Sequence, residues 1–599
     1  MQGYNTMERA ARGRQGVALV YAVFGAFVAA SMVTVMFTMA GVSNKGATVK
    51  RTTLQARYLA EGGVEAGLRD VRVAIANWNE PPASGEVAVG PTAVAYTITE
   101  VGTEQISVDP SGIQTIVRPF EVRAEARVEG YRARAHRIVH AASTPLFQFA
   151  VFYSNDLEVF PGPNMTLGGR VHSNGNMYLG SGATLTLDTN YVRAVGDIFR
   201  RRKHNSESTG NVDIRKWVAD PFDPSEPREF FRMNSRTQMG GVTTASGYDS
   251  AFTEGYDHNG DGDFWDTGDW LPFAPGAAEY WGAPQGYSGS GQTVMTGEHG
   301  ITEAMTPGSG SIAMFDAVEG GSFAFDSASG EYQYVGAGNG THDRGYYHAN
   351  AGLVILVAAD GLSFEAFDAA GNDITSAVAS AVTLTSMPDM RQSGSTAARV
   401  PTVQVDVAVL NASGHFPPNG LLYAAHYGMG QGTAAKGLLL TNGRELAAPL
   451  TAVTEGALYL RGDYNTVAKK GAAIIGDAVN LLSNAWTGSK SPGSLPAATE
   501  TTFNCAMVTG NTATAGNSYS GGLENLPRFH ESWSGVRCNI RGSFVNLYES
   551  HYATGAWVHG GDRYTAPVRN WSYETLFNSV ANLPPFTPMA VSVVDVVSW

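Results

Sequence analysis

The pattern of apolar and polar positions is most regular near the start of the chain. No charged side chain occurs from Val17 to Val42, and no proline from Thr52 to Trp78. In the latter stretch, apolar side chains recur at the spacing of one helix face. We therefore predict a long helix over 17–78, apolar all round in its first half and amphipathic in its second. Residues 17–42 would rise ~39 Å as a helix, enough to cross the ~30 Å hydrocarbon core of a membrane.

After this helix the period changes from that of a helix to that of strands. Two runs in which apolar and polar residues alternate, Phe120–Val128 and Tyr131–Val139, flank the turn dipeptide Glu129-Gly130. This pattern predicts a β-hairpin. We expect residues 79–146 to form a small antiparallel sheet. The arginines in both runs indicate one solvated strand face rather than an anion site.

A third pattern, of very short β runs, begins near residue 147. Three-residue runs are separated by the turn dipeptides Pro161-Gly162, Gly168-Gly169 and Asn174-Gly175. Such runs are too short for a sandwich and suit the rungs of a β-solenoid. A similar pattern returns at Leu438–Asp463. We predict one β-solenoid-like domain built from residues 147–205 and 346–599, with 206–345 inserted between them, and a final strand near Val591–Val597 tucked into a sheet.

Composition supports a mostly β fold. Glycine makes up 71 of 599 residues, charged residues only 16%, and glycine supplies the positive φ of tight turns. The fold class predicted is therefore α+β, mostly β. The formal net charge of −14 excludes a nucleic-acid partner, which needs a basic face.

One acidic segment in the insertion has the start of a calcium loop. The D-x-[DN]-x-[DN]-G pattern is met by Asp257, Asn259, Asp261 and Gly262. Calcium prefers oxygen ligands, which alternating carboxylates on a turning loop supply. Gly268 stands where the bidentate acid is expected, and Asp269 follows it. We predict calcium bound by Asp257, Asn259, Asp261, Asp263, Asp266 and Asp269; the alternative is an acidic surface loop without metal.

The chain has two cysteines, Cys505 and Cys538. An exported protein would favour a disulfide between them, and two separate buried thiols are the alternative.

Basic residues precede the apolar stretch, and one glycine separates the two. Arg9, Arg12 and Arg14 come before Gly16, which places the N-terminus in the cytoplasm and the rest of the chain outside it. Basic residues after the stretch reduce this asymmetry. An ordinary signal peptide cleaved near Ser43 is the alternative, but its apolar region would be shorter.

Two segments of the N-terminal region resemble those of a known protein family. They are Arg14-Gln15-Gly16-Val17-Ala18-Leu19-Val20 and Tyr58-Leu59-Ala60-Glu61-Gly62-Gly63-Val64-Glu65-Ala66-Gly67. From Met1 to about Glu80 the chain resembles minor pilins of the PilX type in type IV pili and the related type II secretion pseudopilins. The resemblance implies a leader peptide over 1–16 that a prepilin peptidase removes, leaving Val17 first. It also implies partner pilins that pack on the helix, and anchoring in the cytoplasmic membrane.

The chain departs from that family at one position and lacks the motifs of common enzymes. Tyr21 stands where most pilins have glutamate, which resembles subunits placed at a fibre tip. No G-x-S-x-G, H-E-x-x-H or G-x-x-x-x-G-K-[ST] motif occurs. We therefore predict a structural subunit that assembles into or caps a pilus or pseudopilus, and not an enzyme. The alternatives are a membrane-anchored cell-surface adhesin and a calcium-dependent polysaccharide-active enzyme.

Overall fold

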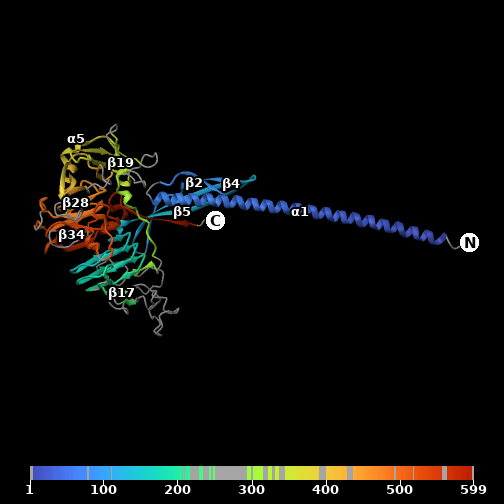
Figure 1. Cartoon of the computed structure of the whole chain (residues 1–599), viewed down its shortest axis with the longest axis horizontal. Coiled ribbons are helices and arrows are strands. Elements are labelled where there is room, and N and C mark those ends of the chain that lie inside the picture. Colours follow the sequence, from blue (N-terminus) through green and yellow to red (C-terminus); the bar gives the residue numbers. More distant parts are fainter. Residues whose placement is uncertain are drawn as a thin grey trace.

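The computed structural model describes most of the chain outside the region of residues 216–344. The described residues are 5–76, 80–109, 111–205, 207, 209–215, 225, 228–233, 242–244, 247–249, 293–297, 301–314, 322–326, 331–335, 345–389, 399–427, 436–490, 494–516, 518–555, 557 and 563–596. Figure 1 shows a long helix that projects from a β-rich body. The protein is mostly β with a long N-terminal apolar helix and several sheets, as predicted.

The helix, α1 (Asn5–Ala76), is continuous over 72 residues. Its second half buries one stripe of small and branched side chains at spacings of three and four residues: Ala56, Ala60, Val64, Leu68, Val71 and Ile75. This is the amphipathic face that the sequence predicts, since residues three and four apart share one side of a helix.

The stripe packs on an antiparallel sheet. Its strands are β1 (Ser84–Val89), β2 (Thr92–Glu100), β3 (Gln105–Val108), β4 (Gln114–Val128), β5 (Tyr131–Pro145) and β37 (Met589–Val596). The predicted hairpin is confirmed, because Val128 pairs with Tyr131. Both residues of the turn have positive φ, 48° at Glu129 and 84° at Gly130, as a two-residue hairpin requires. The C-terminal strand β37 pairs with β5, so a strand from the C-terminal end of the chain completes the sheet formed by residues 84–145.

Two glycines allow α1 to lie very close to this sheet. A Cβ at Gly63 would lie 2.7 Å from Cγ1 of Val94, and one at Gly67 would lie 2.4 Å from Cγ1 of Val122. Glycine normally weakens a helix, and sequence alone gives these residues no other role. In the structure their missing side chains are what permits the contact between α1 and the strands β2 and β4.

The remaining strands form mostly parallel sheets. The largest has the spatial order β18 (Val294–Met295), β12 (Val192–Ala194), β9 (Val171–Ser173), β6 (Val151–Tyr153), β35 (Phe544–Glu549), β32 (Ala506–Asn511), β29 (Ala472–Gly476), β27 (Leu450–Val453), β25 (Leu421–His426), β21 (Leu353–Val357) and β22 (Phe364–Asp368). Among its described strands, only β21 and β22 pair antiparallel.

Four smaller sheets lie beside it. One contains β23 (Val382–Pro388), β24 (Arg399–Asp406), β26 (Gly437–Thr441), β28 (Ala457–Arg461), β30 (Ala478–Leu482) and β33 (Pro527–Phe529). A second contains β16 (Val242–Thr244), β17 (Gly247–Asp249), β13 (Ile198–Phe199), β10 (Met177–Leu179) and β7 (Leu157–Val159), and a third β15 (Phe230–Arg232), β14 (Asn211–Arg215), β11 (Thr184–Asp188) and β8 (Met165–Gly168). The fourth contains β31 (Thr501–Asn504), β34 (Arg537–Gly542) and β36 (Val568–Tyr573). The strands β19 (Ser322–Asp326) and β20 (Glu331–Val335) form a separate hairpin.

Successive strands of the chain pass from one sheet to the next. Thus β6, β7 and β8 belong to three different sheets, and β9, β10 and β11 pair in parallel with the same three strands in turn. Each turn of the chain therefore stacks on the one before it. Apolar side chains inside the turns, such as Leu438, Leu458 and Leu481, form the largest buried cluster. Strands of this stack that are buried on both faces have continuous runs of apolar residues in their sequences, as is usual for parallel strands.

The two parts of this stack meet at one seam. Strand β6 pairs in parallel with β35, which comes from near the other end of the chain, and Tyr153 lies opposite Asn546. Side chains cross the seam as well: Glu524 accepts a hydrogen bond from the backbone N–H of Phe160, and Glu158 accepts one from Thr514. The first part extends beyond the range predicted from sequence, because β14 and β18 lie in the segment 206–345 that we predicted as an insertion.

Replacing Gly67 tests the packing of α1. The substitution Gly67→Ala puts a methyl group into Val122 and Tyr96, so we expect a loss of about 1–3 kcal/mol by overpacking. Hydrogen–deuterium exchange of the full chain should become faster in β2 and β4. The control is Gly46→Ala in the same helix, where no atom lies within 4 Å and alanine should be neutral or stabilising. Unchanged exchange in the Gly67 variant would contradict the packing described.

Glu524 makes the seam sensitive to pH. Burial raises the pKa of Glu524 to about 7; the cation of Arg569 opposes this shift, and the charge of Glu158 adds to it. Because the folded state holds this proton more tightly than the unfolded chain, stability from it is complete below about pH 4.3 and is lost as the pH rises through about 7. Glu524→Gln keeps an oxygen for Phe160 and removes the ionisation.

The variant should therefore gain stability over the natural chain as the pH rises, by on the order of 2 kcal/mol more at pH 8 than at pH 5. Denaturant unfolding at both pH values measures this difference. Glu365→Gln, at an exposed site on β22, is the control. Parallel pH profiles for the Glu524 variant and the natural chain would rule out the effect.

Candidate functional site

The candidate site is the segment 17–51 of α1, which lies before the part of the helix that packs on the sheet. Every side chain from Val17 to Arg51 is exposed. These include fifteen large apolar side chains before Ser43: Val17, Leu19, Val20, Tyr21, Val23, Phe24, Phe27, Val28, Met32, Val33, Val35, Met36, Phe37, Met39 and Val42. A helix that is apolar all round is normally buried in protein or in lipid. This segment is long and apolar enough to cross a membrane.

The serine and threonine side chains within the apolar stretch make hydrogen bonds to the helix itself. Ser31, Thr34 and Thr38 donate hydrogen bonds to the carbonyl oxygens four residues earlier, at 2.8, 2.8 and 2.7 Å. The α-helix also pairs its own backbone groups, which is what a lipid environment requires. Apart from the exposed Tyr21, the stretch therefore presents apolar surface and internally bonded hydroxyls to its surroundings.

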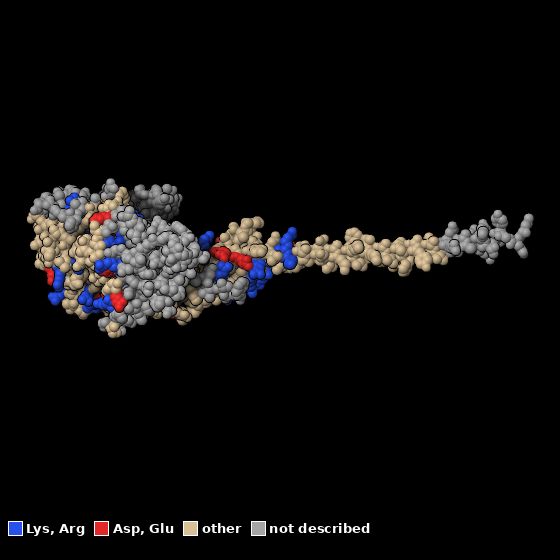
Figure 2. All heavy atoms as spheres, turned by 90° about the horizontal axis from the view of Figure 1, so that it is seen from below, with Lys and Arg blue, Asp and Glu red and all other residues tan. Residues whose placement is uncertain are grey.

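The body of the protein begins at Thr52, the first buried residue of α1 from Val17 onward. Its hydroxyl lies 3.4 Å from a carboxylate oxygen of Glu129, at the tip of the hairpin between β4 and β5. The helix residues 17–51, about 35 residues with a length of roughly 50 Å, precede this point, and α1 continues beyond them to Asn5. Figure 2 shows Lys and Arg side chains gathered where α1 leaves the body.

The hairpin carries part of this basic surface. Glu125 pairs with Arg127, Arg132 and Arg134, all exposed, and the hydrogen bond from Arg132 is the main cause that lowers the pKa of Glu125 to about 2. The arginines lie on a solvated strand face, as the alternating sequence predicts. On the helix, Lys45, Lys50 and Arg51 are exposed and add to the same end of the molecule.

The predicted cleavage position lies within this helix. The backbone of Gly16 is helical and continuous with that of Val17, whose side chain is exposed at the start of the apolar stretch. A cut between the two would remove residues 5–16 of α1 and leave the whole apolar stretch on the mature chain.

The predicted calcium ligands cannot be located in the fold. Asp257, Asn259, Asp261, Asp263, Asp266 and Asp269 all lie outside the described residues. Within the residues that are described, no group of three or more His, Cys, Asp or Glu side chains is placed to hold a metal ion. Calcium binding stays a prediction.

The two cysteines are buried free thiols, so the predicted disulfide is not formed in the structure. In the parallel pair β31–β34, Cys538 lies opposite Thr501. Cys505 comes directly after the end of β31, four residues beyond Thr501. At ~3.3 Å per residue, this offset separates their Cα atoms by more than the ~7 Å that a disulfide spans. Burial raises the pKa of both thiols.

Sequence reasoning missed the polar residues at the seam between β6 and β35. Asp156, Glu158 and Lys203 on one side meet Thr514 and Glu524 on the other. No local pattern marks them, because the two sides come from opposite ends of the two-part domain. The sequence shows only that each side of the seam contains an apolar strand, and it does not show that these two strands pair.

Comparison with known proteins gives little further. No family model matches the chain, and no curated protein matches it. Among solved structures, the chain is similar to the competence-associated pilin ComZ from Thermus thermophilus, with 10% identity and a TM-score of 0.24. The alignment covers 91% of this chain and 98% of that one. At this level the likeness establishes neither family nor function.

Proposed function

We propose that the chain is a pilin-like structural subunit, held in the cytoplasmic membrane by α1 and displaying its β-rich body outside the cell. The observation that carries the proposal is the single helix with two environments. Its first half is bare and apolar over residues 17–42, and its second half is fixed to a sheet by a stripe of small residues. A soluble protein gains nothing from such a projection, since exposed apolar surface is unfavourable in water.

Two surroundings would cover this surface. Lipid covers it before assembly, and the apolar helices of neighbouring subunits would cover it within a fibre, where small residues such as Gly25 and Ala29 allow close approach. The subunit would thus pass from one apolar environment to another without exposing α1 to water. This course is what the resemblance to minor pilins and pseudopilins implies, with other pilins as partners and a prepilin peptidase that cuts between Gly16 and Val17.

The β-rich body is the part that such a subunit would display. We interpret its stacked parallel turns as the β-solenoid-like domain predicted from sequence. A rigid stack of this kind offers a large surface next to the fibre or at its tip. Tyr21, in place of the usual glutamate, favours a capping position over one in the shaft. The role proposed is structural, and no residue is assigned to catalysis.

Blocking the cleavage tests the assembly route. Gly16→Leu should leave an unprocessed chain in the membrane, one that retains the leader over 1–16, because the peptidase of this family requires the small residue before the cut. Immunoblotting of membrane fractions separates the two forms. Gly25→Leu is the matched control, since it lies in the same helix with no atom within 4 Å of the added Cβ. Normal processing of the Gly16 variant would favour a membrane-anchored adhesin unrelated to pili.

We also propose that calcium stabilises the segment Asp257–Asp269. Five aspartates in 13 residues repel one another unless a cation lies among them. Calcium at 100 times its dissociation constant would add about 2.7 kcal/mol to the free energy of unfolding. Thermal unfolding with calcium or with a chelator should therefore differ by several degrees, and the double variant Asp257→Asn/Asp261→Asn should abolish the difference. A natural chain that melts identically in both buffers would remove calcium from the account.

A further inference from the structure

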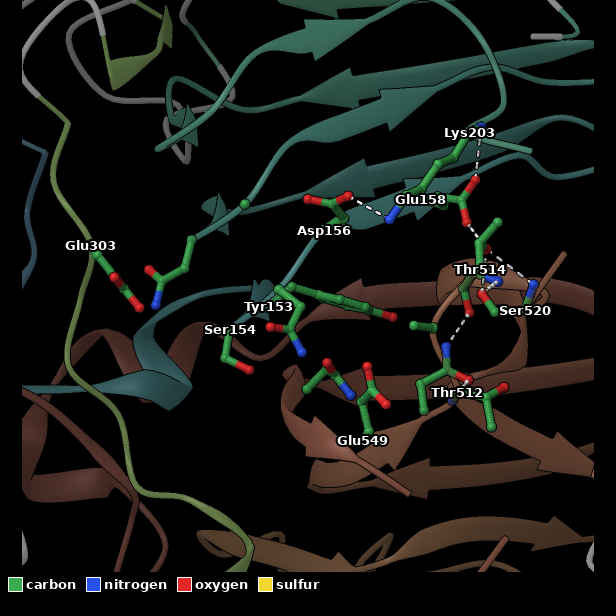
Figure 3. Close-up of a pocket in the computed structure, with 17 residues that line it drawn as sticks. Tyr153, Ser154, Asp156, Glu158, Lys203, Glu303, Thr512, Thr514, Ser520 and Glu549 are labelled. Carbon is green, nitrogen blue, oxygen red and sulfur yellow. Dashed lines mark hydrogen bonds and ion pairs between the residues drawn. The ribbon is translucent and has the colours of Figure 1, made fainter. Parts of the chain in front are cut away.

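The seam between the two parts of the parallel stack holds a pocket of about 440 Å³. It opens where β6 ends beside β35, and its walls come from the turns after β6, β9 and β32. Figure 3 shows side chains from both parts of the stack facing one another across it. The volume lies in the range of sites for small molecules.

The lining of the pocket is polar. Besides its charged groups, it consists of the amides of Asn155, Asn174, Asn511 and Asn546 and the hydroxyls of Ser154, Thr512, Thr514 and Ser520, with Tyr153 as the single aromatic residue. The amides of Asn174, Asn511 and Asn546 already make hydrogen bonds within the protein. The side chains of Ser154, Asn155 and Thr512 make none within the described part of the chain, and a lipid or an aromatic ligand would leave them unpaired, which is costly once water is displaced. A ligand that carries several hydroxyl groups would pair with them.

Tyr153 lines the pocket, and its buried hydroxyl lacks a hydrogen-bond partner among the described residues. Tyr153 is only 3% exposed, and its Oη makes no hydrogen bond within the described part of the chain. In Figure 3 this oxygen points toward the space beside Thr514 and Thr512. Burial, with the nearby charges of Glu524 and Glu158, raises the pKa of Tyr153 well above its usual value. The hydroxyl therefore keeps its proton and can both donate to a ligand and accept from one.

Two of the four carboxylates in the pocket have partners within the described part of the protein, and two do not. Asp156 forms an ion pair of 2.7 Å with Lys203, and both carboxylate oxygens of Glu158 accept hydrogen bonds, from Lys203 N and from Thr514. Glu303 and Glu549 are exposed at the mouth, and among the described residues neither side chain has an ion pair or a hydrogen bond. The four carboxylates outnumber the one ammonium, which favours a cationic ligand.

We propose that this pocket binds a hydroxylated ligand with a protonated amine, of the amino-sugar class. The ammonium lies beside Glu549 at the mouth. The ring hydroxyls reach the amides and hydroxyls of the walls, and one of them meets Tyr153 Oη. The inference stands apart from the proposed function, because the pocket shares no residue with α1.

Calorimetric titration of the full chain in detergent tests the assignment with three probes: the disaccharide of glucosamine, its neutral N-acetylated form, and cadaverine, an amine without hydroxyls. The glucosamine disaccharide should bind saturably, and each of the other two should bind about tenfold more weakly, because each lacks one of the two recognised features. Raising the salt concentration should weaken binding of the charged sugar more than that of the neutral one.

Variants separate the two parts of the pocket. Tyr153→Phe should weaken the glucosamine disaccharide by about fivefold to tenfold, the value of one hydrogen bond, and Glu549→Gln should weaken it while leaving the N-acetylated sugar unchanged. Glu549 is exposed, so its replacement does not endanger folding. Glu365→Gln on β22 is the matched control. Absence of saturable binding, equal affinity for the three probes, or an unchanged affinity in both pocket variants would overturn the proposal, and none of these results bears on processing at Gly16.

Discussion

The close packing of α1 on the antiparallel sheet is the contact on which the rest of the structure depends. One helix carries two incompatible surfaces: a bare apolar one over residues 17–42, and a stripe that needs a protein partner from Ala56 onward. Gly63 and Gly67 let the strands approach the helix where any side chain would collide with them. This contact makes the projecting segment an extension of a fixed element rather than a loose tail. It also determines that the body sits directly next to whatever surrounds the apolar half.

The antiparallel sheet also contacts the parallel stack, and so fixes the position of the stack relative to α1. Strands β4 and β5 lie against α1, and β37 returns from the far end of the chain to pair with β5. A buried arginine ties the sheet to the stack: Arg170 donates to the backbone carbonyl oxygens of Gln148 and Ser111 and to the side chain of Asn578. Helix, sheet and stack are therefore connected by hydrogen bonds and buried side chains as well as by the chain. Forces on the body would pass to the helix.

How much of the fold could be predicted from the sequence depended on how far apart the contacting segments lie along the chain. The helix and the hairpin around Glu129-Gly130 were predictable, since both follow from local period and turn chemistry. The short strands near Val171 and Met177 were also predictable from the sequence. The pairing of β6 with β35 was not, because nothing local shows which strand ends meet, and the pocket with its unpaired Tyr153 hydroxyl exists only through that pairing. The cysteines show the same limit, because two residues suited to a disulfide by compartment are held apart by strand register.

The central claim is that α1 is made as part of a longer precursor and enters an apolar assembly after cleavage. The most direct test is the mass of the N-terminal peptide of the protein isolated from native membranes. The account predicts a first residue of Val17, so that the mature chain begins with the exposed apolar stretch. A chain that begins at Met1, or near Ser43 with that stretch removed, would contradict it.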